Sequence, residues 1–398
     1  MGKVYVGKSV LQAARERVSY AFDNFPNIYL SFSGGKDSGV MMHIACEEAR
    51  RRGRKVGVLI VDLEAQYKLT IDYMISMVEK YRDVIDLHWV CLPLNLRNAV
   101  SNFEPEWTCW DQNSKDKWVR QPPSCAITDS KFFPFFEKGM EFEEFVPEFG
   151  EWYGGGDLVA CLVGIRTQES LNRWRTITSK TKRRWDNKGW TTWIGGGVFN
   201  LYPIYDWQTE DIWRYYGKEK MEYNRLYDYM HRAGLTIHQQ RICQPYGDDQ
   251  RKGLWLFHLI EPETWAKVLE RVNGANQGAL YANERGNILG NHKVTKPEHL
   301  TWQQYAERLL EGMPPSTREH YRDKIAVYLK WYEAKGYDDG IPDEGPANSK
   351  TEPSWTRIVK ALLRNDYWCK GLSFTQTKSG NYHKYRELMQ RRRREWGM

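Results

Sequence analysis

Short apolar runs alternate with amphipathic stretches through the first part of the chain. Residues 27–32, 55–62 and 84–94 are mainly apolar and predict buried strands. Between these runs, residues 39–52 and 67–82 carry apolar side chains at helical spacing. The order of these segments predicts a strand–helix–strand–helix–strand unit.

The same alternation returns after an interruption. Residues 157–167 and 199–207 predict two more strands, and residues 209–216 predict a helix that Asp206 or Thr209 would open. Repeated strand–helix units predict an α/β fold with a doubly wound parallel sheet and right-handed crossovers.

The interruption, residues 95–130, has no periodicity of its own. Trp107, Trp110 and Trp118 lie in this long polar stretch. Long connections without regular structure are often functional, so we expect a lid or a binding segment here.

The second part of the chain has a helical pattern. A chain of 398 residues exceeds what one hydrophobic core usually contains. We therefore predict two domains, an α/β domain over residues 1–220 and an α-helical domain over residues 221–398. The predicted helices are 223–233, 263–272, 302–310, 318–333, 355–363 and 382–394, with a surface loop at 338–348.

A glycine-rich turn, Ser33-Gly34-Gly35-Lys36-Asp37-Ser38, joins the first predicted strand to the first helix. Backbone N–H groups at a helix start converge on an anion, glycines permit close approach, and a lysine adds positive charge. Asp37 and Ser38 can cap the helix or reach a magnesium ion. The turn predicts a phosphate site, and a merely capped strand-to-helix turn is the structural alternative.

Other polar residues follow later strands. Asp62 follows the second strand, and Gly164-Ile165-Arg166 followed by Glu169 and Ser170 ends the fourth. Ligands of open α/β sheets bind beyond the carboxyl ends of the strands, so we expect these ends to face one crevice. Arg166 offers a planar fork to phosphate oxygens, and Glu169 can orient Arg166 or a neighbouring arginine. A glutamate in its favoured place at a helix start is the alternative explanation.

These strings resemble a known family. Ser-Gly-Gly-Lys-Asp-Ser lacks the spacing of a Walker A loop and resembles the PP-loop of the adenine nucleotide α-hydrolase superfamily. Gly-x-Arg-x-x-Glu-Ser is similar to a second signature of phosphoadenosine phosphosulfate (PAPS) reductase-like proteins, and the segment from Pro203 to Trp213 is similar to one that follows their last strand. The resemblance implies an adenine nucleotide α-hydrolase-like fold that binds ATP, or a related adenine nucleotide, with magnesium. Motifs and strand ends together assign the nucleotide to Ser31, Ser33, Gly34, Gly35, Lys36, Asp37, Ser38, Asp62, Gly164, Arg166, Glu169, Ser170 and Arg173.

Two further features bear on the resemblance. The C-terminal half resembles a group named after the immunoglobulin-binding regulator A of bacteria and prophages, which implies a ParB-like protein partner and a role in regulation or phage–host conflict. PAPS reductases carry a nucleophilic cysteine in Glu-Cys-Gly-x-His, whereas Cys369 here lies in Trp-Cys-Lys-Gly-Leu. We therefore do not expect PAPS reduction.

Charge suggests an anionic ligand or partner. The net charge is +7, and residues 166–188 contain eight basic residues against two acidic ones. Arg175, Lys182, Arg183 and Arg184 form a predicted anion or partner patch that would extend a triphosphate site or receive nucleic acid, unless it is simply a solvated face.

Cysteine usage and hydropathy limit the remaining classes. The seven cysteines form no C-x-x-C pair, and Cys109 and Cys125 are either packing residues or ligands of a metal with distant partners. The chain has no apolar run long enough to cross a membrane and no signal peptide pattern. We expect a soluble, cytoplasmic protein.

The leading hypothesis is an enzyme that cleaves ATP between its α- and β-phosphates. Lys36 and the loop amides would hold the leaving pyrophosphate, Asp37 would place magnesium, and Arg166 would neutralise charge at the α-phosphate. Asp62 would meet the ribose or adenine. The alternative is a nucleotide-sensing regulator without turnover that binds protein or DNA, which the arginine run at 391–394 suits.

Overall fold

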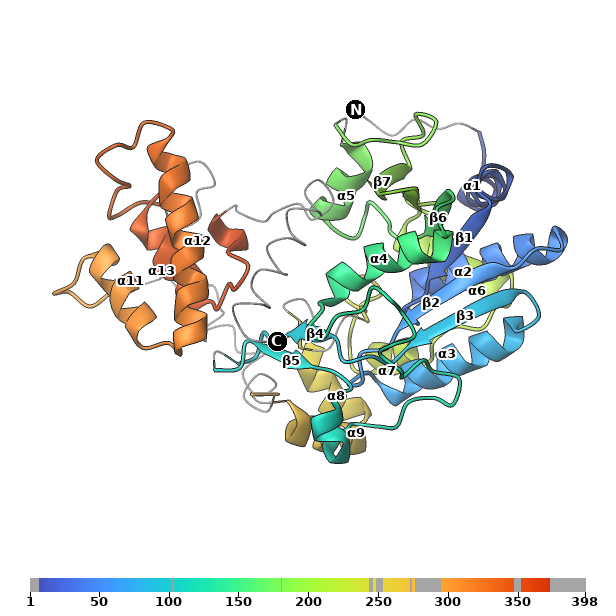
Figure 1. The fold of residues 1–398 in the computed structure, drawn as a ribbon, viewed down its shortest axis with the longest axis horizontal. Helices are drawn as coiled ribbons and strands as arrows, with labels where there is room; N and C mark the ends of the chain where they lie inside the picture. Colours follow the sequence, from blue (N-terminus) through green and yellow to red (C-terminus); the bar gives the residue numbers. More distant parts are fainter. Residues whose placement is uncertain are drawn as a thin grey trace.

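The computed structural model describes residues 7–101, 103–179, 181–242, 246–247, 253–272, 274–275, 295–346 and 352–372. A six-stranded sheet of order β3-β2-β1-β6-β8-β7 lies at the centre of its N-terminal part (Figure 1). The five neighbours β3, β2, β1, β6 and β8 are parallel, and β7 runs antiparallel to β8 at the edge. The strands are β1 (Asn27–Ser31), β2 (Val56–Val61), β3 (Ile85–Val90), β6 (Val159–Leu162), β7 (Thr191–Gly195) and β8 (Val198–Leu201). The predicted α/β class is confirmed.

The strand order reverses beside β1. The chain steps outward from β1 to β2 and β3, and it then returns to place β6 on the other side of β1. Helix α2 packs on β1 and β2, and α4 packs on β6, β7 and β8. The flanking helices are α1 (Val10–Asn24), α2 (Lys36–Arg51), α3 (Lys68–Tyr81), α4 (Phe142–Gly154), α5 (Leu171–Thr178) and α6 (Thr209–Lys218). The carboxyl ends of β1 and β6 therefore flank the topological switch point.

Several elements were not predicted. Helices α1, α4 and α5 and the short helix α8 (Leu254–Ile260) are additions to the predicted set, as are the paired strands β4 (Asn95–Arg97) and β5 (Glu106–Thr108). The proposed capping role of Asp206 is wrong, because its carboxylate accepts two hydrogen bonds from Arg17. Gln208 is the N-cap residue of α6 and forms a capping box with Asp211.

The described residues of the segment 95–130 pack into the fold, and a lid or binding role for the segment stays a prediction. Trp107, Trp110 and Trp118 are buried in the first hydrophobic core. Residues 112–117 form a 3-10 helix, and Trp110 and Trp118 meet edge to face. Irregular structure here is held by packing and by hydrogen bonds to the buried groups of Asp62 and Glu64.

Two hydrophobic cores divide the described residues. The first contains the sheet and also α7 (Leu226–Arg232), α8 and α9 (Pro262–Arg271). The second is formed by α11 (Trp302–Glu311), α12 (Pro315–Glu333) and α13 (Trp355–Leu363), which gather beside the sheet-containing part (Figure 1). Strand signals do fade near residue 220, but the first core continues to Ala275. The division into 1–220 and 221–398 stays a prediction.

The last predicted helix and the expected lack of a membrane span complete the comparison with the sequence. The predicted helix at 382–394 and the arginine run within it lie outside the described residues. Among the residues that the structure does describe, none of the helices has the length and hydropathy needed to span a membrane.

Candidate active site

The switch point brings the two main motifs into contact. A Cβ atom on Gly164, after β6, would lie 3.0 Å from both the carbonyl carbon of Asp37 and the backbone nitrogen of Ser38. These are backbone atoms at the start of α2, which cannot swing aside. Glycine at position 164 therefore allows the two strand ends to approach each other closely.

The turn after β1 is fixed by its neighbours. Gly34 has a φ of +70°, and a Cβ there would lie 2.7 Å from side-chain atoms of Met74 and Thr70. Its carbonyl oxygen accepts a hydrogen bond from Asn224 at 3.0 Å. The Ser33 and Ser38 hydroxyl oxygens lie 3.1 Å apart, and Ser38 also donates to the carbonyl of Gly35. Gly35 is the N-cap residue of α2, so no side chain closes the helix start.

Lys36, Asp37 and Arg166 meet at this helix start. The Asp37 carboxylate lies between two cations, with Lys36 Nζ 3.2 Å from one oxygen and Arg166 Nε bonded to the other. Lys36 and Arg166 are buried, with exposed fractions of 4% and 2%. Burial lowers the pKa of Lys36, Asp37 opposes that shift, and Arg166 adds to it. Two buried cations thus share one carboxylate.

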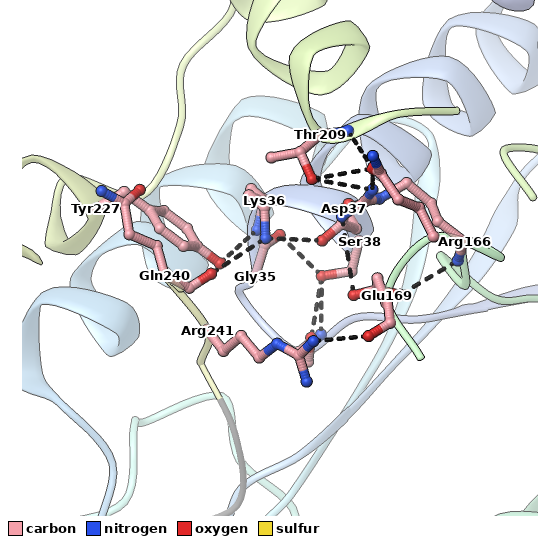
Figure 2. A network of polar contacts seen from close by, with 12 residues as sticks. Gly35, Lys36, Asp37, Ser38, Arg166, Glu169, Thr209, Tyr227, Gln240 and Arg241 are labelled. Carbon is pink, nitrogen blue, oxygen red and sulfur yellow. Dashed lines mark hydrogen bonds and ion pairs between the residues drawn. The ribbon is translucent and has the colours of Figure 1, made fainter. Parts of the chain in front are cut away.

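The rest of the second motif holds Arg166 in place. Gln168 and Thr209 accept hydrogen bonds from Arg166 Nη1 at 3.2 and 3.3 Å (Figure 2). The Glu169 carboxylate accepts from the Arg166 backbone N–H and forms an ion pair with Arg173. Arg166 Nη2 lies 3.9 Å from Glu169, beyond hydrogen-bond distance. This nitrogen is therefore the donor of Arg166 best placed to meet a phosphate oxygen.

The remaining predicted contacts of the two motifs lie nearby. Ser31 is the last residue of β1, and Ser170 is the N-cap residue of α5, where its hydroxyl accepts from the backbone N–H of Arg173. Sequence reasoning missed Gln168 and also three residues on the far side of the turn, Tyr227, Gln240 and Arg241 (Figure 2).

Asp62 belongs to a different network. Its buried carboxylate accepts from Trp89 and from the backbone of Glu64, and it pairs with Arg120. The Glu64 carboxylate, equally buried, pairs with Arg271 at 2.8 Å. These pairs anchor the segment that contains Trp110, whose indole donates to the Asp62 carbonyl. A contact of Asp62 with ribose or adenine stays a prediction.

The basic patch lies on and after α5. Arg175 is exposed, Arg183 lies over the Trp193 ring, and Arg184 donates to the Ser179 carbonyl at 2.6 Å. Lys182 donates to the Gly189 carbonyl, and burial lowers its pKa to about 8. The patch therefore continues from the site along α5, and its partner stays a prediction.

Cys109, Cys125 and Cys369 lie within the described residues, whereas Cys243 lies outside them. Cys369 is buried in the second core, and burial raises its pKa to about 12. Cys109 is buried and its thiol faces the Leu92 carbonyl, whereas Cys125 is exposed. Within the described ranges, no group of three or more His, Cys, Asp or Glu residues is arranged to hold a metal ion. A thiol kept protonated by burial is a poor nucleophile.

Three similar proteins place the chain among known sequences and structures. The chain is 48% identical over 399 residues to the uncharacterized protein YbdN of Escherichia coli K12, covering 100% of this chain and 98% of that protein. It is 21% identical over 252 residues to the phosphoadenosine 5'-phosphosulfate reductase of Yersinia enterocolitica, covering 58% and 78% of the two chains. The crystal structure of the PAPS reductase of Candida auris aligns with a TM-score of 0.32 and 14% identity, over 57% of this chain and 94% of that one.

Family comparison divides the sequence near the end of α7. Residues 234–344 match a domain of unknown function, DUF3440. Residues 27–233, which include every strand of the central sheet and both motifs, match the phosphoadenosine phosphosulfate reductase domain. This match covers more than half of the chain, and the protein belongs to the phosphoadenosine phosphosulfate reductase domain family.

Proposed function

We propose that the protein binds ATP at the switch point and cleaves it between the α- and β-phosphates. The observation that carries this proposal is the convergence of Lys36, Asp37 and Arg166 where the ends of β1 and β6 meet. Buried cations beside a glycine-rich helix start favour a polyphosphate ligand. The family provides a nucleotide-binding fold, and the buried Cys369 thiol argues against the reductive chemistry.

Each side chain has a separate task in the proposed reaction. The Lys36 side chain and the turn amides other than those of Ser33 and Lys36 hold the leaving pyrophosphate. Arg166 donates through Nη2 to the α-phosphate, where charge grows in the transition state. Asp37, with Gln168 and Thr209, keeps the Arg166 guanidinium in one orientation. Because these groups are buried and held in advance, little reorganisation is needed when charge develops.

Magnesium fits this site only together with the nucleotide. Asp37 offers one carboxylate, and both of its oxygens already face cations. Mg²⁺ is commonly held by one or two carboxylates together with substrate phosphates and water. We propose that magnesium arrives with ATP, that Asp37 is its protein ligand, and that the ion supplies charge neutralisation of the phosphates.

Incubation with ATP and magnesium, followed by chromatography, tests the activity. We expect AMP and pyrophosphate, or a stable adenylated product if an acceptor is supplied. Lys36→Ala should weaken ATP binding by about tenfold to a hundredfold, because one charge-assisted contact contributes about 1.5–3 kcal/mol. Lys68→Ala is the matched control, since this exposed lysine lies on α3 and pairs with Asp72 within the part of the chain that the structure describes. Release of ADP and phosphate by the wild type would refute the proposed position of cleavage.

A nucleotide sensor is the alternative that the same experiment separates. Tight ATP binding without any product would favour a regulator, in line with the resemblance to the immunoglobulin-binding regulator A group. We propose that a ParB-like protein is the partner in either case. Co-purification of the two proteins, compared with and without ATP, tests this part independently of turnover.

A further inference from the structure

A second segment, distant in sequence, reaches the phosphate turn. Tyr227 accepts a hydrogen bond from the backbone N–H of Lys36 at 3.0 Å, and the Gln240 carbonyl accepts from Lys36 Nζ at 3.3 Å (Figure 2). Arg241 donates to the Glu169 carbonyl at 2.7 Å. The segment thus touches the end of the first motif and the middle of the second.

This arrangement is held by ordered structure around it. The Tyr227 ring packs edge to face on Trp213, and Gln240 is only 2% exposed. The Gln240 amide donates to the Leu235 carbonyl at 3.2 Å, and Thr236 and Gln239 close the intervening turn. Residues 236–241 therefore form an ordered turn that places the Gln240 carbonyl against Lys36 and the Arg241 guanidinium beside it.

The charges around the turn are unequal. Among the described contacts, Lys36 and Arg166 share the single carboxylate of Asp37, and Arg241 contacts a carbonyl oxygen and no carboxylate, which leaves positive charge in excess. Arg241 is bonded to a carbonyl oxygen, which carries no net charge, and its guanidinium is near enough to lower the pKa of Lys36. The charge of Arg241 is thus available to an anion bound beside the turn.

The N–H group of Lys36 gives a reason why such a cation is needed. In a glycine-rich turn the first amides of the helix usually cradle the anion. Here the Lys36 backbone N–H already donates a hydrogen bond to the Tyr227 hydroxyl. A phosphate at this turn therefore needs another donor, and Arg241 is the exposed cation that lies beside it.

We propose that Arg241 is a binding residue for the pyrophosphate part of the ligand and that residues 236–241 complete the site. This assigns a role to the start of the region that matches the domain of unknown function, which begins at residue 234. The identity of the ligand as a nucleotide rests on the proposed function. The anion site itself is expected to take inorganic pyrophosphate as well.

Calorimetry with inorganic pyrophosphate tests the inference in the full chain. We expect Arg241→Ala to weaken pyrophosphate binding by about tenfold or more, and Arg241→Lys to recover part of the loss because it keeps the charge without the fork. Arg232→Ala is the matched control, an exposed arginine on α7 that lies over the Tyr229 ring, and it should bind like the wild type. All four proteins should melt within a few degrees of one another.

The outcomes separate this inference from the proposed function. Unchanged pyrophosphate affinity in Arg241→Ala, or no binding by the wild type, would overturn the inference. Arg241-dependent pyrophosphate binding without any AMP formation would retain the inference and reject ATP cleavage. AMP formation with the same KM for ATP in the wild type and in Arg241→Ala would retain ATP cleavage and reject the binding role of Arg241.

Discussion

Two groups of charged residues at the carboxyl ends of neighbouring parallel strands differ in their balance of charge. At the ends of β1 and β6, four cations surround two carboxylates, and Arg241 is exposed. At the end of β2, Asp62 and Glu64 are buried and each pairs with one arginine, Arg120 or Arg271. The first arrangement has positive charge in excess, and the second is balanced.

A ligand is expected at the group with unbalanced charge. A balanced, buried pair gains little from an added anion and fixes the segment that covers it. An unbalanced cluster at a topological switch point gains from any anion that neutralises it. Strand ends alone therefore did not identify the site, because Asp62 and Arg166 both follow a parallel strand.

The largest expected effect concerns the balanced end. Arg271→Ala leaves the buried Glu64 carboxylate, among the described contacts, with the backbone donors of Trp110 and Val119. An uncompensated buried charge destabilises by about 3–5 kcal/mol, so the free energy of unfolding in urea should fall by that amount. Arg214→Ala, in an exposed pair with Asp211, should change it by less than about 1 kcal/mol.

A double variant sharpens this prediction. Glu64→Gln combined with Arg271→Ala removes the unpaired charge, so the protein should be more stable than Arg271→Ala alone. A loss below about 1 kcal/mol in Arg271→Ala would mean that the segment 107–120 is held by packing rather than by this pair.

A smaller effect is expected where the two motifs touch. Gly164→Ala introduces a Cβ about 3.0 Å from the backbone of Asp37 and Ser38, so the start of α2 must shift. Overpacking of this kind costs about 1–3 kcal/mol, and here it should appear mainly as weaker ATP binding. Gly189→Ala is the control, because a Cβ there meets no atom within 4 Å. Equal ATP affinity in both variants would show that the contact of the two loops does not shape the site.

Local pattern predicted much of this region and missed its distant parts. The predicted strand at 55–62 and helix at 67–82 end within a residue of β2 and α3, since apolar periodicity there is strong. The predicted helix at 39–52 began three residues late, because Lys36 and Asp37 are polar residues in its first turn. Helix α1 has a readable stripe at Ala14, Val18 and Ala21 that was overlooked.

The site shows the same limit more clearly. Both motifs are local strings and were found from their residues. Tyr227 and Gln240 lie 191 and 204 positions from Lys36, and nothing in their own sequence context indicates the contact. Similarly, the pairing of Glu64 with Arg271 spans 207 positions. Contacts of this kind depend on tertiary packing, which periodicity cannot predict.

Charge reversal in the basic patch after α5 should change the binding of an anionic partner and leave the fold unchanged. Reversing Arg183 and Arg184 to Glu should flatten the salt dependence of nucleic-acid binding by about one unit for each phosphate contact removed, measured by fluorescence anisotropy between low and moderate salt. ATP affinity should stay nearly intact, because neither side chain contacts Lys36, Asp37 or Arg166 among the described interactions. An acidic protein partner would instead be lost in co-purification. Loss of ATP binding with unchanged partner binding would place these arginines in the nucleotide site and refute a second partner.

The smallest expected effect concerns the thiol of the second core. Cys369 is 1% exposed, packs with that core, and has a pKa raised to about 12 by burial, so almost none of it is thiolate at neutral pH. We therefore expect no sulfite from PAPS with thioredoxin, and ATP binding in Cys369→Ser equal to that of the wild type.

The charge excess at β1 and β6 would still let PAPS bind as a competitor of ATP, because PAPS carries the same kind of anionic groups. Binding without reduction would show that this member of the family keeps the anion site and lacks the reductive step. Robust sulfite release that disappears in Cys369→Ser would instead show that the second core opens and supplies its thiol to the site.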